Sequence, residues 1–224
     1  LLQKRGALVI EVPYLLPLIK KLAYDTIYHE HVSFFSMKSL GFFFHSIGYE
    51  IFHVEEIEYL GGTMRLFVGR KGDHKLDSSM EDLTSLESNQ KLHDKQTFTE
   101  FAKNVYKARD ELAGLLYGLK RDGKKIIGIG APTKGNTLLN FRRIGTNILD
   151  FTSDVIPAKL GRFTPGTHIP ITTDKTACDE NPDYALLLSW NLADEIISKL
   201  RETMKFNGGF IVPIPEPRII TKKV

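Results

Sequence analysis

Four polar side chains follow one another in the segment Tyr28-His29-Glu30-His31, which is bordered by apolar residues. An ordinary histidine has a pKa of about 6.5, so His31 could act as a general base at neutral pH. Glu30 could orient or polarise the site. Tyr28 could donate a hydrogen bond to the enolate oxygen that forms when a proton leaves a carbon next to a ketone. These residue types would suit base-assisted removal of a proton from carbon.

Two other interpretations of this segment stay open from the residues alone. A partly exposed loop would satisfy its histidines by hydrogen bonds to the backbone and carry no chemistry. His29 and His31 are two positions apart, so in a strand both would face one side and could bind a metal. Because no further ligand follows at a suitable spacing, we predict no metal site.

A second candidate is the glycine-containing loop that begins after Ile127, Gly128-Ile129-Gly130-Ala131-Pro132-Thr133-Lys134-Gly135-Asn136-Thr137. A dinucleotide fingerprint would need glycine at Thr133, and a Walker loop would need lysine at Asn136, so neither NAD nor ATP is expected. A nicotinamide oxidoreductase is disfavoured for the same reason. A glycine turn that opens a helix can still present amides to a diphosphate. We therefore predict that Thr133, Lys134 and Asn136 bind substrate, the alternative being a purely structural turn.

A third candidate is the loop Gly161–Ile171, which glycines and prolines hold in place. Loops of this length in α/β proteins commonly carry function. Its Arg162 has the planar fork that suits phosphate, and His168 adds a second polar group. We predict that both contact substrate, although surface loops also carry arginine for solubility.

The elements that must position these residues follow from hydrophobic periodicity and from the breaks between apolar runs. The first part of the chain predicts strands over 7–12, 49–57 and 63–68 and a helix from Ser36 to Gly48. The later part predicts a long helix from Phe98 to Leu119, strands over 126–130, 148–151, 184–188 and 209–214, and helices over 136–141 and 192–204. Strands that alternate with helices predict an α/β fold with a parallel sheet. The apolar stripe of the long helix could also be a dimer seam, but it lacks flanking charge pairs, and the oligomeric state is left open.

Composition narrows the class of protein. The 224 residues carry a formal charge of +3 that is dispersed along the chain, which argues against a nucleic-acid partner. Apolar runs are only a few residues long, so no membrane span is expected. The single cysteine, Cys178, cannot form an internal disulfide and is typical of a reducing compartment, which predicts a cytoplasmic location.

Five ordered blocks of the sequence together resemble one family, the sugar C-methyltransferases that act on nucleotide-linked deoxysugars. The blocks are Tyr24–Ser33, Gly61-Gly62 with Arg65, Gly130–Thr137, Gly161–Ile171 and Pro213–Arg218. The resemblance implies an S-adenosylmethionine-dependent enzyme whose substrate is a dTDP-linked 4-keto-6-deoxysugar, methylated at C3 through an enolate. It also implies that Tyr28, Glu30 and His31 line the reaction site, with His31 as the base.

The same resemblance predicts how the chain is organised. Residues 1–72 would be the end of an S-adenosylmethionine-dependent methyltransferase domain, 73–94 a linker, and 95–224 a Rossmann-like substrate-binding domain. The fold class is then a Rossmann-like parallel sheet domain preceded by the last strands and helix of a class I methyltransferase sheet. The loop that binds the methyl donor would lie mostly outside this chain, and zinc would be bound only in an upstream region. We therefore expect the chain alone to be inactive, the alternative being a non-catalytic nucleotide-sugar-binding or assembly module.

Overall fold

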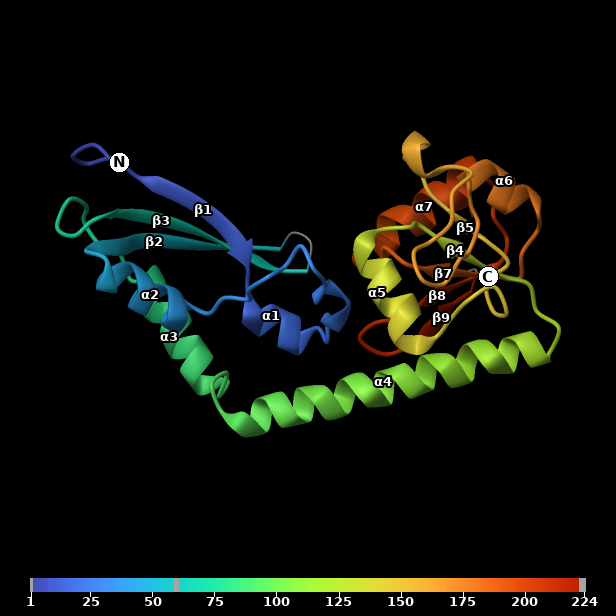
Figure 1. Cartoon of the computed structure of the whole chain (residues 1–224), viewed down its shortest axis with the longest axis horizontal. Coiled ribbons are helices and arrows are strands. Elements are labelled where there is room, and N and C mark those ends of the chain that lie inside the picture. Colours follow the sequence, from blue (N-terminus) through green and yellow to red (C-terminus); the bar gives the residue numbers. More distant parts are fainter. Residues whose placement is uncertain (1, 59–60, 222–224) are drawn as a thin grey trace. The chain divides into compact units, whose positions relative to one another are not determined.

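The computed structural model describes residues 2–58 and 61–221, and the chain divides into two compact units (Figure 1). The first unit comprises Leu1–Ala23 and His31–Lys103, and the second comprises Tyr24–Glu30 and Asn104–Val224. The second unit thus contains a short piece of chain from the amino-terminal region. No helix among residues 2–58 and 61–221 has both the length and the apolar character needed to cross a membrane.

The first unit is built on a three-stranded antiparallel sheet in the order β1-β3-β2. Its strands are β1 (Leu8–Pro13), β2 (Tyr49–Ile57) and β3 (Thr63–Arg70). They match the predicted strands closely because apolar side chains alternate along β3, where Met64, Leu66 and Val68 are fully buried.

Three helices accompany this sheet: α1 (Leu15–Lys20), α2 (Met37–Ser46) and α3 (Ser79–Asn89). Helix α2 begins as predicted, because the Ser36 side chain accepts a hydrogen bond from the Ser39 amide at 3.2 Å. Residues 73–94, predicted as a linker, contain α3, and their side chains Leu83 and Leu92 lie in the core of this unit.

The second unit has a six-stranded sheet in the order β6-β5-β4-β7-β8-β9. The strands are β4 (Ile126–Ile129), β5 (Thr152–Ser153), β6 (Ile171–Thr172), β7 (Tyr184–Leu187), β8 (Gly209–Val212) and β9 (Arg218–Ile220). The neighbouring pairs are parallel except β8 with β9. All four residues of β4 are buried, as expected for a central parallel strand. The predicted Rossmann-like α/β architecture is confirmed.

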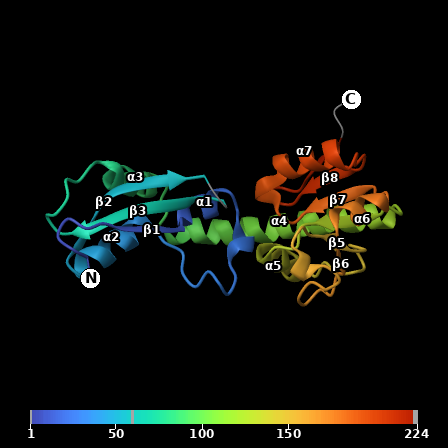
Figure 2. The ribbon, with the colours of Figure 1, turned by 90° about the horizontal axis from the view of Figure 1, so that it is seen from above.

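Helices cover both faces of this sheet: α4 (Lys95–Arg121) and α5 (Thr133–Arg142) on one side, and α6 (Asp174–Asp179) and α7 (Ala193–Thr203) on the other (Figure 2). Ile127, Ala185 and Phe210 stand side by side on three parallel strands and pack with Leu200 of α7 in one apolar cluster. The predicted long helix is confirmed as α4, whose Val105, Ala108, Leu112 and Leu116 are buried along one stripe.

One predicted strand was wrong. The apolar run 148–151 precedes the strand and β5 begins at Thr152, with Ile148 and Leu149 buried in the turn before it. Periodicity cannot separate a buried turn from a buried strand over so few residues. The correction matters for the site, because it moves the carboxyl end of the strand from Phe151 to Ser153.

Candidate functional site

The segment that carries the predicted base starts with a single 3₁₀ turn, Tyr24–Thr26, which packs against α5 in the second unit. The Tyr24 hydroxyl accepts hydrogen bonds from the Arg142 guanidinium, at 3.1 Å from Nε and 2.5 Å from Nη2. Arg142 in turn donates from Nη1 to the Ala108 carbonyl at 2.7 Å. Burial raises the pKa of the Tyr24 hydroxyl, and the guanidinium partly offsets this effect. The turn is therefore anchored at its first residue.

The predicted catalytic residues follow this anchored turn. Tyr28 is half-buried and belongs to the second unit; burial, followed by the charges of Glu30 and Asp25, raises its pKa. The side chains of His29 and Glu30 are exposed, with His29 Nε2 lying 3.9 Å from Glu30 Oε1. His31, the first residue assigned to the other unit, makes an edge-to-face contact with the Phe34 ring, with centroids 6.0 Å apart.

The glycine loop after β4 forms the start of α5, as the strand-loop-helix pattern predicts. Gly130 has a φ of +85°, and a Cβ atom there would lie 2.8 Å from the Ser189 hydroxyl, so the position requires glycine. Thr133 is the first residue of α5, where backbone amides have no intrahelical partner, whereas the Asn136 amide donates to the Pro132 carbonyl at 3.2 Å. The Asn136 Oδ1 atom is buried and has no hydrogen-bond partner among the described residues.

The Lys134 side chain contacts two neighbouring residues of the second unit. Its ammonium group donates to the Asn191 side-chain oxygen and lies 5.2 Å from the centre of the Trp190 ring. Burial lowers the pKa of Lys134, and the charge of Asp25 acts in the opposite direction. Lys134 is thus linked to the segment before the predicted base, and its role toward substrate stays a prediction.

The loop Gly161–Ile171 is held to the rest of the second unit by backbone and side-chain hydrogen bonds. The Ile171 amide donates to the Arg162 carbonyl at 2.8 Å, and the Asn140 amide group donates to the Pro165 carbonyl at 3.0 Å. The side chains of Arg162 and His168 are exposed. The loop is therefore fixed while these two polar groups are available to a ligand.

A cavity of about 340 Å³ lies at the carboxyl ends of β4, β5 and β7. The sheet order reverses at β4, because the chain continues to β5 on one side and later enters β7 on the other. Ligands of open α/β sheets bind in the crevice at such a switch point. The cavity wall is formed by Ile129, Ile156 and Leu192 together with two lysine–aspartate pairs.

Those pairs bring charged residues into the cavity that sequence reasoning missed. Lys159 donates to Asp154 Oδ2 at 2.9 Å, and Lys199 donates to Asp174 Oδ2 at 2.8 Å. Burial raises the pKa of Asp154, but hydrogen bonds from the Ile156 amide, Lys159 and the Ala131 amide hold it below its ordinary value. Asp154 could have been found from the sequence because it directly follows a buried strand, β5. The strand was predicted at 148–151 instead, so this position of Asp154 was not recognised.

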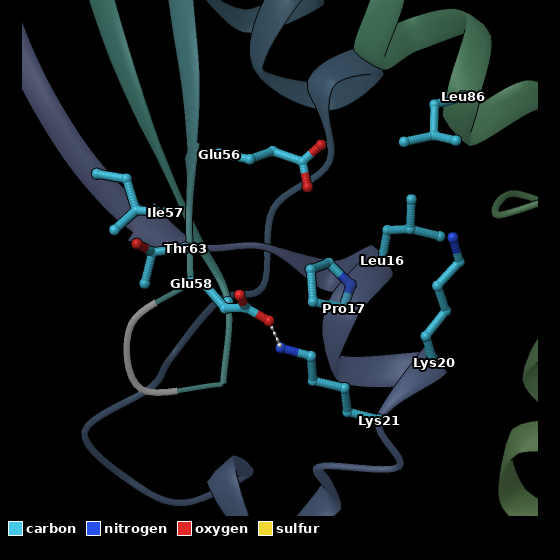
Figure 3. Close-up of a pocket in the computed structure, with 10 residues that line it drawn as sticks. Leu16, Pro17, Lys20, Lys21, Glu56, Ile57, Glu58, Thr63 and Leu86 are labelled. Atoms are coloured by element: carbon cyan, nitrogen blue, oxygen red, sulfur yellow. Dashed lines mark hydrogen bonds and ion pairs between the residues drawn. The ribbon is translucent and has the colours of Figure 1, made fainter. Parts of the chain in front are cut away.

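The first unit has a cavity of its own, of about 490 Å³, between α1, the ends of β2 and β3, and α3 (Figure 3). Its lining includes Lys20 at the end of α1, Lys21 directly after it, Glu56 and Glu58. Lys21 donates to Glu58 at 3.4 Å across one side (Figure 3). No predicted site residue lies in it. Among the described residues, no group of three or more histidine, cysteine, aspartate or glutamate side chains could hold a metal ion.

The amino-acid sequence is similar to those of C-methyltransferases. The family described as "C-methyltransferase C-terminal domain" matches residues 58–215. A protein named C-methyltransferase NovU, from Streptomyces niveus, is 39% identical over 222 residues. That match covers 99% of this chain and 53% of the relative, so the chain spans about half the relative's length. Because 99% of the chain is covered, the similarity to this relative includes the segment Tyr24–His31, which lies outside the family match.

Proposed function

Because the chain belongs to the C-methyltransferase family, we propose that it carries the base and the acceptor-binding part of an enzyme that methylates a carbon of a nucleotide-linked 4-keto-deoxysugar. The observation that carries this proposal is the position of the Tyr24–Glu30 segment. It belongs to the Rossmann-like unit, where it packs against α5, the helix that the glycine loop opens. Tyr28, Glu30 and the predicted nucleotide loop therefore belong to one unit, and His31, the proposed base, is the residue that directly follows this segment.

In the proposed reaction His31 takes the proton from the sugar carbon next to the ketone, and the electron pair of the broken C–H bond moves into the enolate. Tyr28 donates a hydrogen bond to the enolate oxygen, a role that suits a hydroxyl whose raised pKa keeps it protonated. Glu30 orients or polarises the site. S-adenosylmethionine supplies an electrophilic methyl group when bound.

The donor does not fit the part of the chain that the structure describes in the first unit. Nucleotide-like ligands bind at the carboxyl ends of parallel strands, and the first unit has an antiparallel sheet. We assign no residue of this chain to S-adenosylmethionine, in keeping with a donor loop that lies mostly outside it. Zinc likewise has no proposed ligand here.

The nucleotide half of the acceptor is proposed to lie on the second unit. Thr133, Lys134 and Asn136 at the start of α5, with Arg162 and His168 of the neighbouring loop, are the proposed contacts for the diphosphate and sugar. The cavity at the end of β4 has apolar walls that suit a nucleobase ring, with paired charges at its polar side. A dTDP group is the expected nucleotide.

The test is exchange of the sugar C3 proton with solvent deuterium in the full-length protein. His31→Ala is expected to abolish exchange, because it removes the base. The matched control is His29→Ala, since His29 is an exposed histidine in the same segment and should leave exchange within about twofold. Undiminished exchange in His31→Ala would rule out the assigned base.

The alternative function is a non-catalytic module that binds a nucleotide sugar, and the independent cavity of the second unit favours it. Titration calorimetry of this chain with dTDP and no methyl donor tests it. Binding that is lost in Lys134→Ala or Arg162→Ala, and kept in the exposed control Arg143→Ala, supports nucleotide binding by the second unit. Exchange of the sugar C3 proton by the full-length protein then distinguishes the two functions, because only the enzyme is expected to catalyse it.

A further inference from the structure

Asp25 is a fully buried carboxylate that the proposed reaction does not use. Its side chain has no exposed surface, although it lies in a short turn of the chain rather than in a helix or strand core. Burying a charged group without partners is costly, so such a residue is retained where it makes specific contacts. Its neighbours in the sequence include Tyr28 and Glu30, three and five positions later.

The partners of Asp25 come from a distant part of the second unit. The Trp190 ring nitrogen donates to Asp25 Oδ2 at 2.6 Å, and the positive charge of Lys134 faces the carboxylate. Lys134 also donates to Asn191 and lies over the Trp190 ring. One carboxylate thus connects the base segment both to the turn after β7 and to the first turn of α5.

The chain between Asp25 and Tyr28 leaves little freedom. The Ile27 amide donates to the Tyr24 carbonyl and the Tyr28 amide to the Thr26 carbonyl, each at 3.1 Å. With Tyr24 bound to Arg142 on one side and Asp25 bound to Trp190 on the other, the turn has two side-chain attachments. The contacts of Tyr24 with Arg142 and of Asp25 with Trp190 therefore determine where Tyr28 lies.

We propose that Asp25 is a positioning residue, which holds the segment carrying Tyr28 and Glu30 against the start of α5 through its contacts with Trp190 and Lys134. The importance of this role rests on the proposed function, because it is the reaction that requires the segment to be held in place. The contact itself does not depend on that function. It can be measured in this chain without any substrate.

Trp190 is the only tryptophan in the sequence, so its emission reports the contact directly. In a titration from pH 4.5 to 8, emission is expected to change with a midpoint of about 6, because burial raises the pKa of Asp25 to about 6. The other titratable groups that face Asp25 are Lys134, Tyr24 and Tyr28. None of these three ordinarily titrates near pH 6. Asp25→Asn should therefore lose the transition, and the exposed control Asp179→Asn should keep it.

Hydrogen exchange tests whether the contact holds the segment. In Asp25→Ala the amides of Ile27 and Tyr28 are expected to exchange at least tenfold faster at pH 7, while amides of α7 keep their rates. Trp190→Phe removes the donor but keeps an aromatic ring, and should have the same effect. This second variant keeps the test decisive if Asp25→Ala fails to fold. Unchanged exchange at Ile27 and Tyr28 in the folded variants would overturn the proposal.

Kinetics of the full-length enzyme separate positioning from general destabilisation. Asp25→Ala is expected to lower kcat by about 10- to 100-fold with KM for the nucleotide sugar within twofold, since misplacing a reacting group costs rate. Asp25→Asn, which can still accept the Trp190 hydrogen bond, should restore most of kcat. An unchanged kcat in Asp25→Ala would overturn the positioning role. If the full-length protein shows no methylation at all, the proposed function fails. The amide hydrogen-exchange result at Ile27 and Tyr28 still tests the positioning contact.

Discussion

The charge on buried Asp25 should lower the stability of the second unit at neutral pH. Its pKa rises from an ordinary value of 3.8 to about 6, mainly because burial disfavours the charged form. The folded protein therefore holds the Asp25 proton more tightly than the unfolded chain does. Between pH 4 and 6 the free energy of unfolding falls as the pH rises, and above pH 6 the full penalty is present.

The size of this penalty follows from the pKa difference. A shift of about two pKa units corresponds to about 3 kcal/mol, at 1.36 kcal/mol for each unit. Asp25→Asn removes the charge and keeps an oxygen that can accept the hydrogen bond from Trp190. Because Lys134 then loses its anionic neighbour, we expect the variant to gain about 1–3 kcal/mol at pH 7.5. At pH 4.5, where only the unfolded chain is largely ionised at this position, the gain should be about a third as large.

Urea unfolding at these two pH values, followed by Trp190 emission, measures the stability of the second unit alone. The control is Asp179→Asn, which breaks a surface ion pair with Lys175 and should change stability by less than about 0.5 kcal/mol at either pH. Our reasoning is refuted if Asp25→Asn is less stable than the parent at pH 7.5, or if it gains equally at both pH values. Either result would mean that the buried charge does not cost stability.

Three further changes test other parts of the structure. Glu87, fully buried, accepts hydrogen bonds from two backbone amides at the start of α2, so Glu87→Ala should lower the stability of the first unit by about 1–3 kcal/mol in thermal unfolding followed by circular dichroism. Gly166→Ala should destabilise more than Gly161→Ala, because both have positive φ but only the Gly166 Cβ would strike Asn140; matched melting temperatures decide this. Burial, with two nearby carboxylates, raises the pKa of Cys178, so its reaction with a thiol reagent at pH 8 should be several-fold slower than that of free cysteine, and an equal rate would contradict this.

Much of the fold could be predicted because local patterns and tertiary packing agree. Strands β2 and β3 and helix α2 lie where alternation, the Ser36 cap and the glycine breaks place them. Short elements such as β6 and α6 were not predicted, since two to six residues carry too little periodicity to identify. Strand β5 was misplaced because its buried neighbours Ile148 and Leu149 have the same composition as a strand.

The site divides in the same way between what is local and what is distant in the chain. The sequence by itself determined the candidate base segment Tyr28–His31 and the glycine loop that opens α5, because each depends on residues that are adjacent along the chain. Only the tertiary structure decided that Asp25 meets Trp190 across 165 positions and that Lys134 faces the same carboxylate. Contacts at that separation depend on the order of the strands, which brings the end of β7 beside the start of α5, and no local pattern encodes that order.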